Sequence, residues 1–241
     1  MPTDYQLMVD LYEKLGQDRS VFKTSDVAHV VVHQNKVIGA HTVPGLEVCP
    51  TELADGVALS VKLAPDTVIP KRVHMCFGVL PEKGRQRIVL EVSIGARGRM
   101  EVLAHCVFPN AVDVRHLMDA QIRVAEGASY RYLERHVHGR DGGVQVVPKA
   151  RVRRGPYARF ETEFELIEGR VGQMEIDYET WCAPHSSMRM VARVAGRGDD
   201  RIQLREVGHL EGEGSAGVLL SRIAVRDQAE ANVYNELTAS A

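Results

Sequence analysis

Apolar and polar residues alternate along most of this chain in short runs that are typical of β-strands. After about residue 85, ten such runs follow one another, from RIVLEVSI to GVLLSRIAV, and no segment between them has a helical period. A period of two places successive side chains on opposite faces of a sheet. The pattern therefore predicts a mainly β protein.

Turn residues separate these strands at nearly even intervals between Gly95 and Gly214, and the intervals leave no room for crossover helices. Such a series can build an antiparallel sandwich or barrel, or a β-solenoid of stacked half-coils. Several turns share an apolar residue followed by glycine and a small residue, as in SIGARG and VAEGAS. Because stacked coils place equivalent turns along one edge, the repeated turn chemistry favours the solenoid.

The first residues have a different texture and predict a helix with a small α/β segment at residues 1–66, followed by a β-helix core domain at residues 67–241. Thr3 can cap the helix, and Gly16 can end it. Its expected apolar stripe repeats every four residues and consists of Leu7, Leu11 and Leu15.

Two further segments of this N-terminal region have no helical stripe of that kind. The β-branched residues 27–43 predict a pair of strands with a turn at Asn35-Lys36. Residues 52–63 have a mixed pattern that is compatible with a short helix or with a strand.

The composition excludes several classes of function. The 241 residues carry 30 basic and 32 acidic side chains in an interspersed order, so no nucleic-acid or anionic-membrane partner is expected. No run approaches the roughly 20 apolar residues of a spanning helix, and the N-terminus lacks a signal pattern. Four widely spaced cysteines indicate free thiols in a reducing, cytoplasmic compartment.

Candidate metal ligands gather in the segment SYRYLERHVHG, residues 129–139. On a strand, Glu134, His136 and His138 share one face with two tyrosines. His136 and His138, about 7 Å apart at the backbone, can converge on one metal ion if another strand supplies a third ligand. The alternative is a solvent-facing ladder of hydrogen-bonded polar side chains. A His-x-His strand also suggests a cupin-like metalloenzyme, although Asp141 stands where its glutamate is expected.

Two other histidine and cysteine pairs differ in their geometry. His105 and Cys106 are adjacent, so a regular strand points them to opposite faces. Cys106 shares its face with apolar residues and is compatible with a core position. His74 and Cys76 are two residues apart and share a face, as a metal-binding pair requires. No nucleophile elbow, P-loop or dinucleotide fingerprint occurs in the chain.

Several motifs in fixed order resemble the SufB/SufD family, the scaffold subunits of the SUF system of iron–sulfur cluster assembly, and most closely its shorter, archaeal-type members. The resemblance covers roughly residues 70–237. The motifs are HMCFG, AHCVFPN, HLMDA, VAEGASYRYLERHVHG, LIEGRVGQMEIDYE, GRGDDRI, LEGEGSAGVLLSRIAVRD and EANVYNEL.

This resemblance implies a right-handed parallel β-helix and a non-enzymatic scaffold that carries a transient iron–sulfur cluster or iron. It also implies a homodimer, or a heterodimer with a SufB/SufD paralogue, and docking of a SufC-type ABC ATPase. The small β-rich metalloenzyme is the alternative function. Family members continue beyond the last strand with a Gly-His motif and SufC-binding helices, whereas this chain stops at Ala241, so the usual C-terminal segment is expected to be lacking.

The ligands of the cluster must then come from neighbouring coils of the β-helix. The expected cluster-binding residues are Cys106, His105, Glu134, His136 and His138. The expected metal ligands are Cys106, His136, His138, Cys76 and His74.

Overall fold

The strands of the structure follow the two-residue alternation of the sequence. In β8 (Asp113–Val124) every second side chain, from Val114 to Val124, is buried, and most of the intervening ones are exposed. The buried side chains of successive strands form one continuous hydrophobic cluster along the molecule.

The computed structural model describes residues 2–14 and 17–240. The elements in order are α1 (Asp4–Lys14), η1 (Arg19–Phe22), β1 (His29–His33), β2 (Lys36–His41), β3 (Leu46–Leu53), β4 (Gly56–Leu63), β5 (Val73–Gly78), β6 (Lys83–Ile94), β7 (Arg99–Phe108), β8, β9 (Ser129–His138), β10 (Val144–Arg154), β11 (Arg159–Leu166), β12 (Gly172–Cys182), β13 (Ser187–Gly196), β14 (Arg201–Leu210), β15 (Ala216–Val225) and β16 (Glu230–Ala239).

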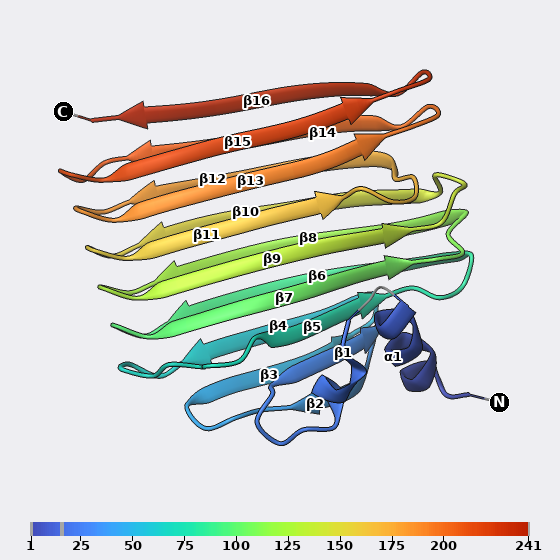
Figure 1. Ribbon diagram of the computed structural model, residues 1–241, viewed down its shortest axis with the longest axis horizontal. Coiled ribbons are helices and arrows are strands. Elements are labelled where there is room, and N and C mark those ends of the chain that lie inside the picture. Colours follow the sequence, from blue (N-terminus) through green and yellow to red (C-terminus); the bar gives the residue numbers. More distant parts are fainter. Residues whose placement is uncertain (1, 15–16, 241) are drawn as a thin grey trace.

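The described strands form two eight-stranded sheets that stack coil upon coil (Figure 1). Sheet A has the order β15-β13-β11-β9-β7-β5-β1-β2, and sheet B has the order β16-β14-β12-β10-β8-β6-β4-β3. From β5 onward, each coil contributes one strand to each sheet. The expected β-solenoid with a short N-terminal helix is therefore confirmed.

Neighbouring coils pair in parallel and in a constant register. Val144 of β10 lies opposite Val114 of β8, one coil earlier, and opposite Gly172 of β12, one coil later. Two turn intervals of the sequence thus make one coil. The parallel pairing excludes the antiparallel sandwich that the strand pattern alone left open.

Antiparallel pairing, within the described residues, joins only β1 to β2 and β3 to β4. The predicted first strand pair is confirmed, but its turn lies at Gln34-Asn35, one residue before the predicted Asn35-Lys36, because Lys36 already belongs to β2. Residues 52–63 are not a helix, because they form the last two residues of β3, the turn that follows and the whole of β4. Both hairpins continue into the coils through the parallel pairs β1–β5 and β4–β6.

Helix α1 begins at the predicted cap and buries a different face from the one predicted. Thr3 Oγ1 accepts a hydrogen bond from the Gln6 amide at 3.3 Å, and Gln6 Oε1 accepts one from the Thr3 amide at 2.9 Å. The buried residues of α1 are Met8, Val9 and Tyr12. Leu7 is 38% exposed, because the direction in which a helix crosses a sheet, and not the spacing of its leucines, decides which side chains meet the sheet.

Leu11 of the predicted stripe is partly buried. Leu15 of that stripe, and Gly16 as the predicted end of the helix, lie outside the described residues. In the part of the chain that the structure describes, no helix has the length and apolar character needed to cross a membrane.

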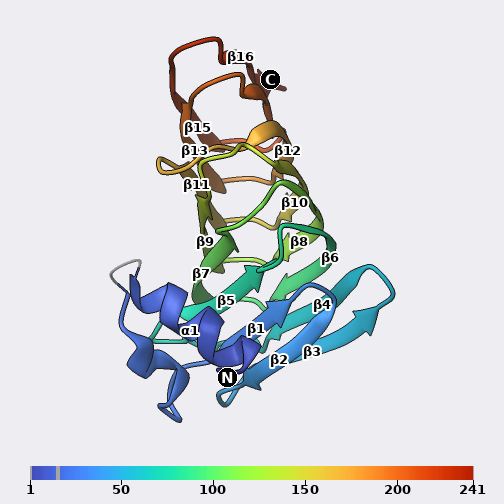
Figure 2. The same cartoon turned by 90° about the vertical axis from the view of Figure 1, so that its right-hand side faces the viewer.

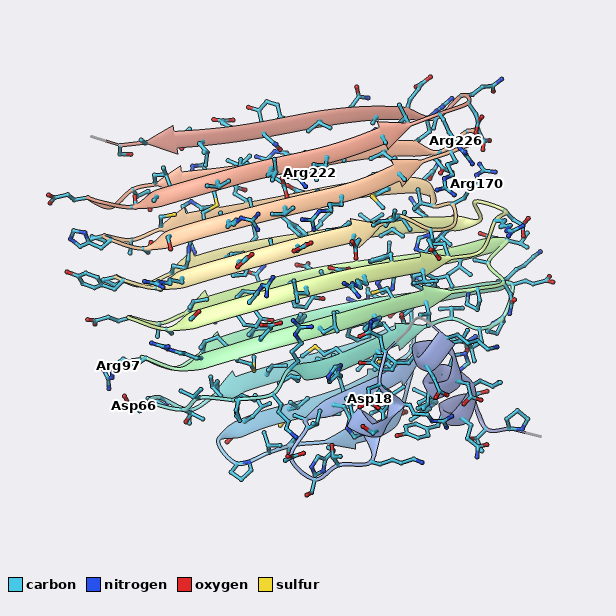
Figure 3. The ribbon with its side chains drawn as sticks, viewed as in Figure 1. Asp18, Asp66, Arg97, Arg170, Arg222 and Arg226 are labelled. Carbon is cyan, nitrogen blue, oxygen red and sulfur yellow. The ribbon has the colours of Figure 1, made fainter. Side chains whose placement is uncertain are left out.

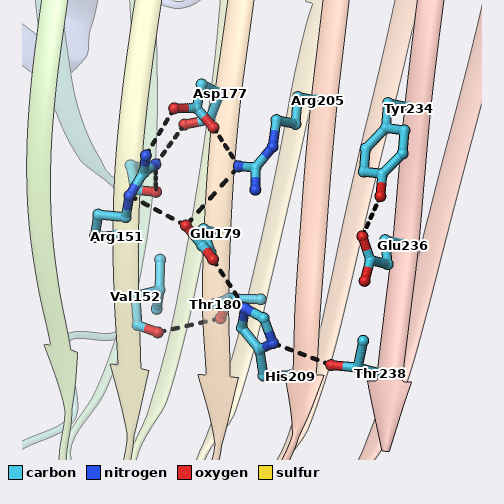
Figure 4. Close-up of polar contacts among 11 residues, drawn as sticks. Arg151, Val152, Asp177, Glu179, Thr180, Arg205, His209, Tyr234, Glu236 and Thr238 are labelled. Atoms are coloured by element: carbon cyan, nitrogen blue, oxygen red, sulfur yellow. Dashed lines mark hydrogen bonds and ion pairs between the residues drawn. The ribbon is translucent and has the colours of Figure 1, made fainter.

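Ladders of opposite charge cover the outer faces of the coils. In sheet B, Asp177 accepts hydrogen bonds at 2.7 Å from both Arg151 and Arg205, which belong to the strands on either side (Figure 4). At the turn edge, Arg97 donates to Asp66 of the preceding coil at 2.5 Å (Figure 3). Exposed pairs of this kind contribute only about 0.2–1 kcal/mol each, so the ladders mainly keep both faces solvated.

A glycine is required at the turn that follows β11. Gly169 has a φ of +83°, and a Cβ there would clash with the carbonyl oxygen of His138. Gly127 also has a positive φ, of +64°, but its nearest neighbour, Arg97 Cγ, would lie at 3.4 Å. Gly127→Ala should therefore cost about 1–2 kcal/mol through the backbone alone.

We predict that Gly169→Ala lowers the melting temperature clearly more than Gly127→Ala does, because only the former adds a steric clash. Thermal melts followed by circular dichroism measure both. Equal shifts would show that the coil relaxes around the added methyl group.

Glu206 of β14 is a buried carboxyl group near the C-terminal end of the stack. It is 2% exposed, its Oε2 has no hydrogen-bond partner, and burial raises its pKa to about 7. A raised pKa means that the folded chain holds this proton more tightly than the unfolded chain does. The resulting stabilisation is full below the ordinary pKa of 4.5 and is lost as the pH rises through about 7.

We predict that Glu206→Gln stabilises the protein, and that this gain increases by on the order of 2 kcal/mol between pH 5 and pH 8. Melting temperatures at the two pH values measure the effect. Glu175→Gln, on the exposed face of β12, is the control and should change neither value. A gain that is the same at both pH values would contradict the assignment.

Candidate metal centre

The inner faces of β7 and β9 bring a thiol and an imidazole side by side. These strands are neighbours in sheet A, and their register places Cys106 opposite His136. Both residues fall on the inward-facing parity of their strands, and they are 1% and 3% exposed. In any two parallel strands with this register, the two-residue alternation of side chains alone places these two residues on the same face of the sheet.

His116 reaches the same point from the opposite sheet. It lies on β8 in sheet B and is 1% exposed. One ligand atom from each of Cys106, His116, Glu134 and His136 lies within 4.8 Å of the others. We call these four residues the inner quartet. The sequence predicted that a metal site at His136 needs a third ligand from another strand. The inner quartet contains such a ligand and also a fourth one.

Glu134 is the centre of the hydrogen bonds within the inner quartet. Its Oε1 lies 2.7 Å from His136 Nε2 and accepts a bond of 3.8 Å from the Cys106 thiol. Its Oε2 accepts a bond of 3.3 Å from the hydroxyl group of Tyr178 on β12. Three different strands therefore fix the position of this carboxyl group.

Burial determines the charge of the inner quartet. It lowers the pKa of His116 and of His136 to about 3 and raises the pKa of Glu134 to about 7. Burial also raises the pKa of the Cys106 thiol well above its ordinary value. The imidazoles are therefore neutral, which is the form that binds metal, and the thiol must lose a proton when a metal ion binds.

The donor set fits a transition-metal ion. Thiolate, imidazole and carboxylate ligands suit ferrous iron or zinc. In a tetrahedral site, bonds of about 2.0–2.3 Å place the ligand atoms about 3.3–3.8 Å apart, so a modest contraction of the inner quartet would close it around an ion. His116 Nδ1 is buried without a partner, which leaves a lone pair or an N–H group that a ligand could satisfy.

His138 stands beside the inner quartet rather than in it. Its Nε2 lies 3.2 Å from His136 Nδ1, and its Nδ1 lies 3.2 Å from the carbonyl oxygen of Arg170. It can therefore hold the ring of His136 in position, as outer partners of metal-bound histidines commonly do. The rings of Phe108 and Phe164 pack against these histidines and exclude water.

The solvent-facing ladder considered for residues 129–139 is excluded by burial. Glu134, His136 and His138 are between 1% and 6% exposed and point into the solenoid. The face that they share is the inner one, because the two sheets close around it.

The other predicted ligands lie on the opposite side of sheet A. His74, Cys76 and His105 occupy its outer face beneath α1 and are also buried. The predicted split between His105 and Cys106 is confirmed by this arrangement. One ion cannot take ligands from both faces, so the predicted residues divide into two separate groups.

Sequence reasoning missed two residues of the inner site, His116 and Tyr178. Each shares its strand face with apolar residues, and each lies in sheet B rather than in sheet A. One signal in the sequence could have found His116. It lies at an inward-facing position of the strand that directly precedes the strand with His136. Its meaning depends on knowing that the two sheets face each other.

Comparisons with known proteins bear on the identity of the chain. No protein-family model matches it. It is 30% identical over 233 residues to an iron-sulfur cluster assembly SufBD family protein of Pyrococcus horikoshii, covering 97% of this chain and 71% of the relative. A SufBD family protein of Methanocaldococcus jannaschii is 27% identical over 169 residues, covering 70% of this chain and 54% of the relative. With this likeness along nearly its whole length, the chain belongs to the SufBD family of iron–sulfur cluster assembly proteins.

Proposed function

We propose that this chain is a non-enzymatic scaffold subunit on which an iron–sulfur cluster is assembled, and that the inner quartet holds iron during that process. The observation that carries the proposal is the convergence of four buried donor atoms within 4.8 Å inside the solenoid. The names of the two archaeal relatives support the same role.

The residues of the inner quartet have distinct parts in this proposal. His116 and His136 offer neutral imidazoles without a prior change of protonation. Cys106 supplies a thiolate after its proton has left, and Glu134 supplies the carboxylate that orients both neighbours. The apolar walls keep water away from iron and sulfide, which limits oxidation and loss of the cargo.

A small metalloenzyme that uses His136 and His138 is the less favoured alternative. His138 is engaged with the Arg170 carbonyl oxygen and lies outside the group of converging donors. The relatives are named for iron-sulfur cluster assembly, which is the role proposed above.

We further propose that the chain pairs with a second copy or with a SufB/SufD paralogue through the C-terminal end of the stack. β15 and β16 are the last strands of their sheets. Apolar side chains are exposed on them, namely Val218, Val225, Val233, Tyr234 and Leu237. Unpaired strand edges with apolar side chains favour association with another sheet.

The remaining parts of the proposal concern partner and compartment. A SufC-type ABC ATPase is proposed as the partner that drives assembly, in keeping with the family resemblance. The four cysteines of the described residues are free thiols, which supports a reducing compartment such as the cytoplasm.

We predict that Cys106→Ser sharply lowers iron retention after anaerobic reconstitution with iron and sulfide, because the inner quartet loses its only thiolate. His136→Ala combined with His138→Ala should act in the same direction. Iron analysis and charge-transfer absorption provide the readout, and circular dichroism confirms the fold. Cys49→Ser, an exposed cysteine away from the interior, is the control and should retain iron. Unchanged iron content in Cys106→Ser would overturn the assignment.

We also predict that Val233→Lys combined with Leu237→Lys shifts the protein towards monomer in sedimentation velocity, because two added charges oppose pairing at the edge of β16. Val112→Lys, at an exposed site that is 52% accessible and lies before β8, should leave the oligomer unchanged. A wild-type protein that is monomeric at every concentration would refute the proposed pairing.

A further inference from the structure

A second group of metal-binding side chains lies on the outer face of sheet A. His74 and Cys76 point outward from β5, and His105 points outward from β7. Helix α1 packs beside the first coils (Figure 2). Its Tyr12 lies against His74 and His105 of this group. We call His74, Cys76 and His105 the outer triad.

The positions of the outer triad are fixed by strand register. Cys76 lies directly opposite His105 on the neighbouring parallel strand. Adjacent strands are about 4.8 Å apart, so these two side chains are neighbours on one face. His74 is two residues before Cys76 and shares that face, at a backbone distance of about 7 Å. Three possible donors from two neighbouring strands therefore lie on one patch of the outer face beneath α1.

The outer triad is buried with unsatisfied polar atoms. His105 is 2% exposed, and neither of its ring nitrogens has a hydrogen-bond partner. A buried polar atom without a partner costs about 1–3 kcal/mol, and a phenylalanine or leucine at this position would avoid that cost. His74 and Cys76 are 6% and 4% exposed. An unpartnered imidazole beside a thiol is the arrangement expected of a site whose ligand supplies the missing bonds.

The geometry points to a second metal site, formed by His74, Cys76 and His105 with Tyr12 as its cover, which takes a borderline-soft divalent ion such as zinc or ferrous iron. Thiolate and imidazole donors are those that such ions prefer. This site is independent of the inner quartet and of the proposed role in cluster assembly, because sheet A separates the two groups.

Tyr12 of α1 lies against both imidazoles of the outer triad. The Tyr12 ring lies 4.7 Å from the ring of His105 and 5.8 Å from that of His74, edge-on to both. Its hydroxyl group is 2.8 Å from His74 Nδ1. An ion that binds His74 through Nδ1 must displace the Tyr12 hydroxyl group or bind its oxygen, and displacement of Tyr12 would move α1.

A cavity lies beside the helix at one member of the outer triad. A cavity of about 330 Å³ adjoins His105, and its wall includes Lys14, Arg135 and Glu168. Burial raises the pKa of the Cys76 thiol to about 12 while α1 is closed, so binding of an ion must release the thiol proton. An opening of α1 would admit both the ion and the water that carries this proton away.

Anaerobic titration of the full chain with Co²⁺ tests the site, because thiolate-to-cobalt charge transfer reports a bound cysteine. The Cys106→Ser variant removes the inner thiolate and should keep the absorption of the outer site. Adding Cys76→Ser, or separately His105→Phe, to this variant should abolish or strongly weaken that absorption. His105→Phe also removes the unpartnered nitrogens and should not lower the melting temperature, which separates loss of a ligand from loss of the fold.

Hydrogen exchange of the α1 amides gives an independent readout. Co²⁺ should change exchange in α1 in the Cys106→Ser variant and should have no effect once Cys76→Ser is added. Cys49→Ser is the matched control and should behave as the wild type does. The proposal is overturned if Cys106→Ser shows no cobalt–thiolate absorption, or if Cys76→Ser and His105→Phe leave that absorption unchanged. Neither result would alter the case for iron at the inner quartet.

Discussion

The parallel register between coils is the constraint on which the rest of this structure depends. In the central coils each strand lies in register with the strands one coil before and one coil after it, so an inward side chain lies next to an inward side chain of the following coil. A slip of one residue in β9 would turn His136 and Glu134 outward and place Arg135 inside. The inner site thus exists only because the coils keep their register.

Strand β7 acts as a shared wall between two chemically similar environments. His105 and Cys106 are consecutive residues, yet one faces the outer triad and the other faces the inner quartet. The inner group is enclosed between two sheets, whereas the outer group is covered by a single helix.

Buried polar groups reduce the stability that the apolar interior provides. Glu134 recovers part of this loss through its contacts with Cys106, His136 and Tyr178. Glu206 recovers less, since its Oε2 has no partner. The long ladders of backbone hydrogen bonds and the continuous core stabilise the stack strongly enough to tolerate such groups. The presence of Glu134 in the interior is explained better by ligand binding than by stability.

The sequence by itself determined the strands, the turn interval and the opposite orientation of His105 and Cys106, and its repeated turn chemistry favoured the solenoid. These features are local, because a period of two fixes which side chains share a face and turn chemistry fixes where strands end. The sequence could not show which face of each sheet lies inside. It also could not show that the side chain of His116, on sheet B, lies next to Cys106, or that Tyr12 covers the outer triad. Those relations join residues on different sheets or on a helix and a sheet, and only the closure of the coils and the packing of α1 set their distances.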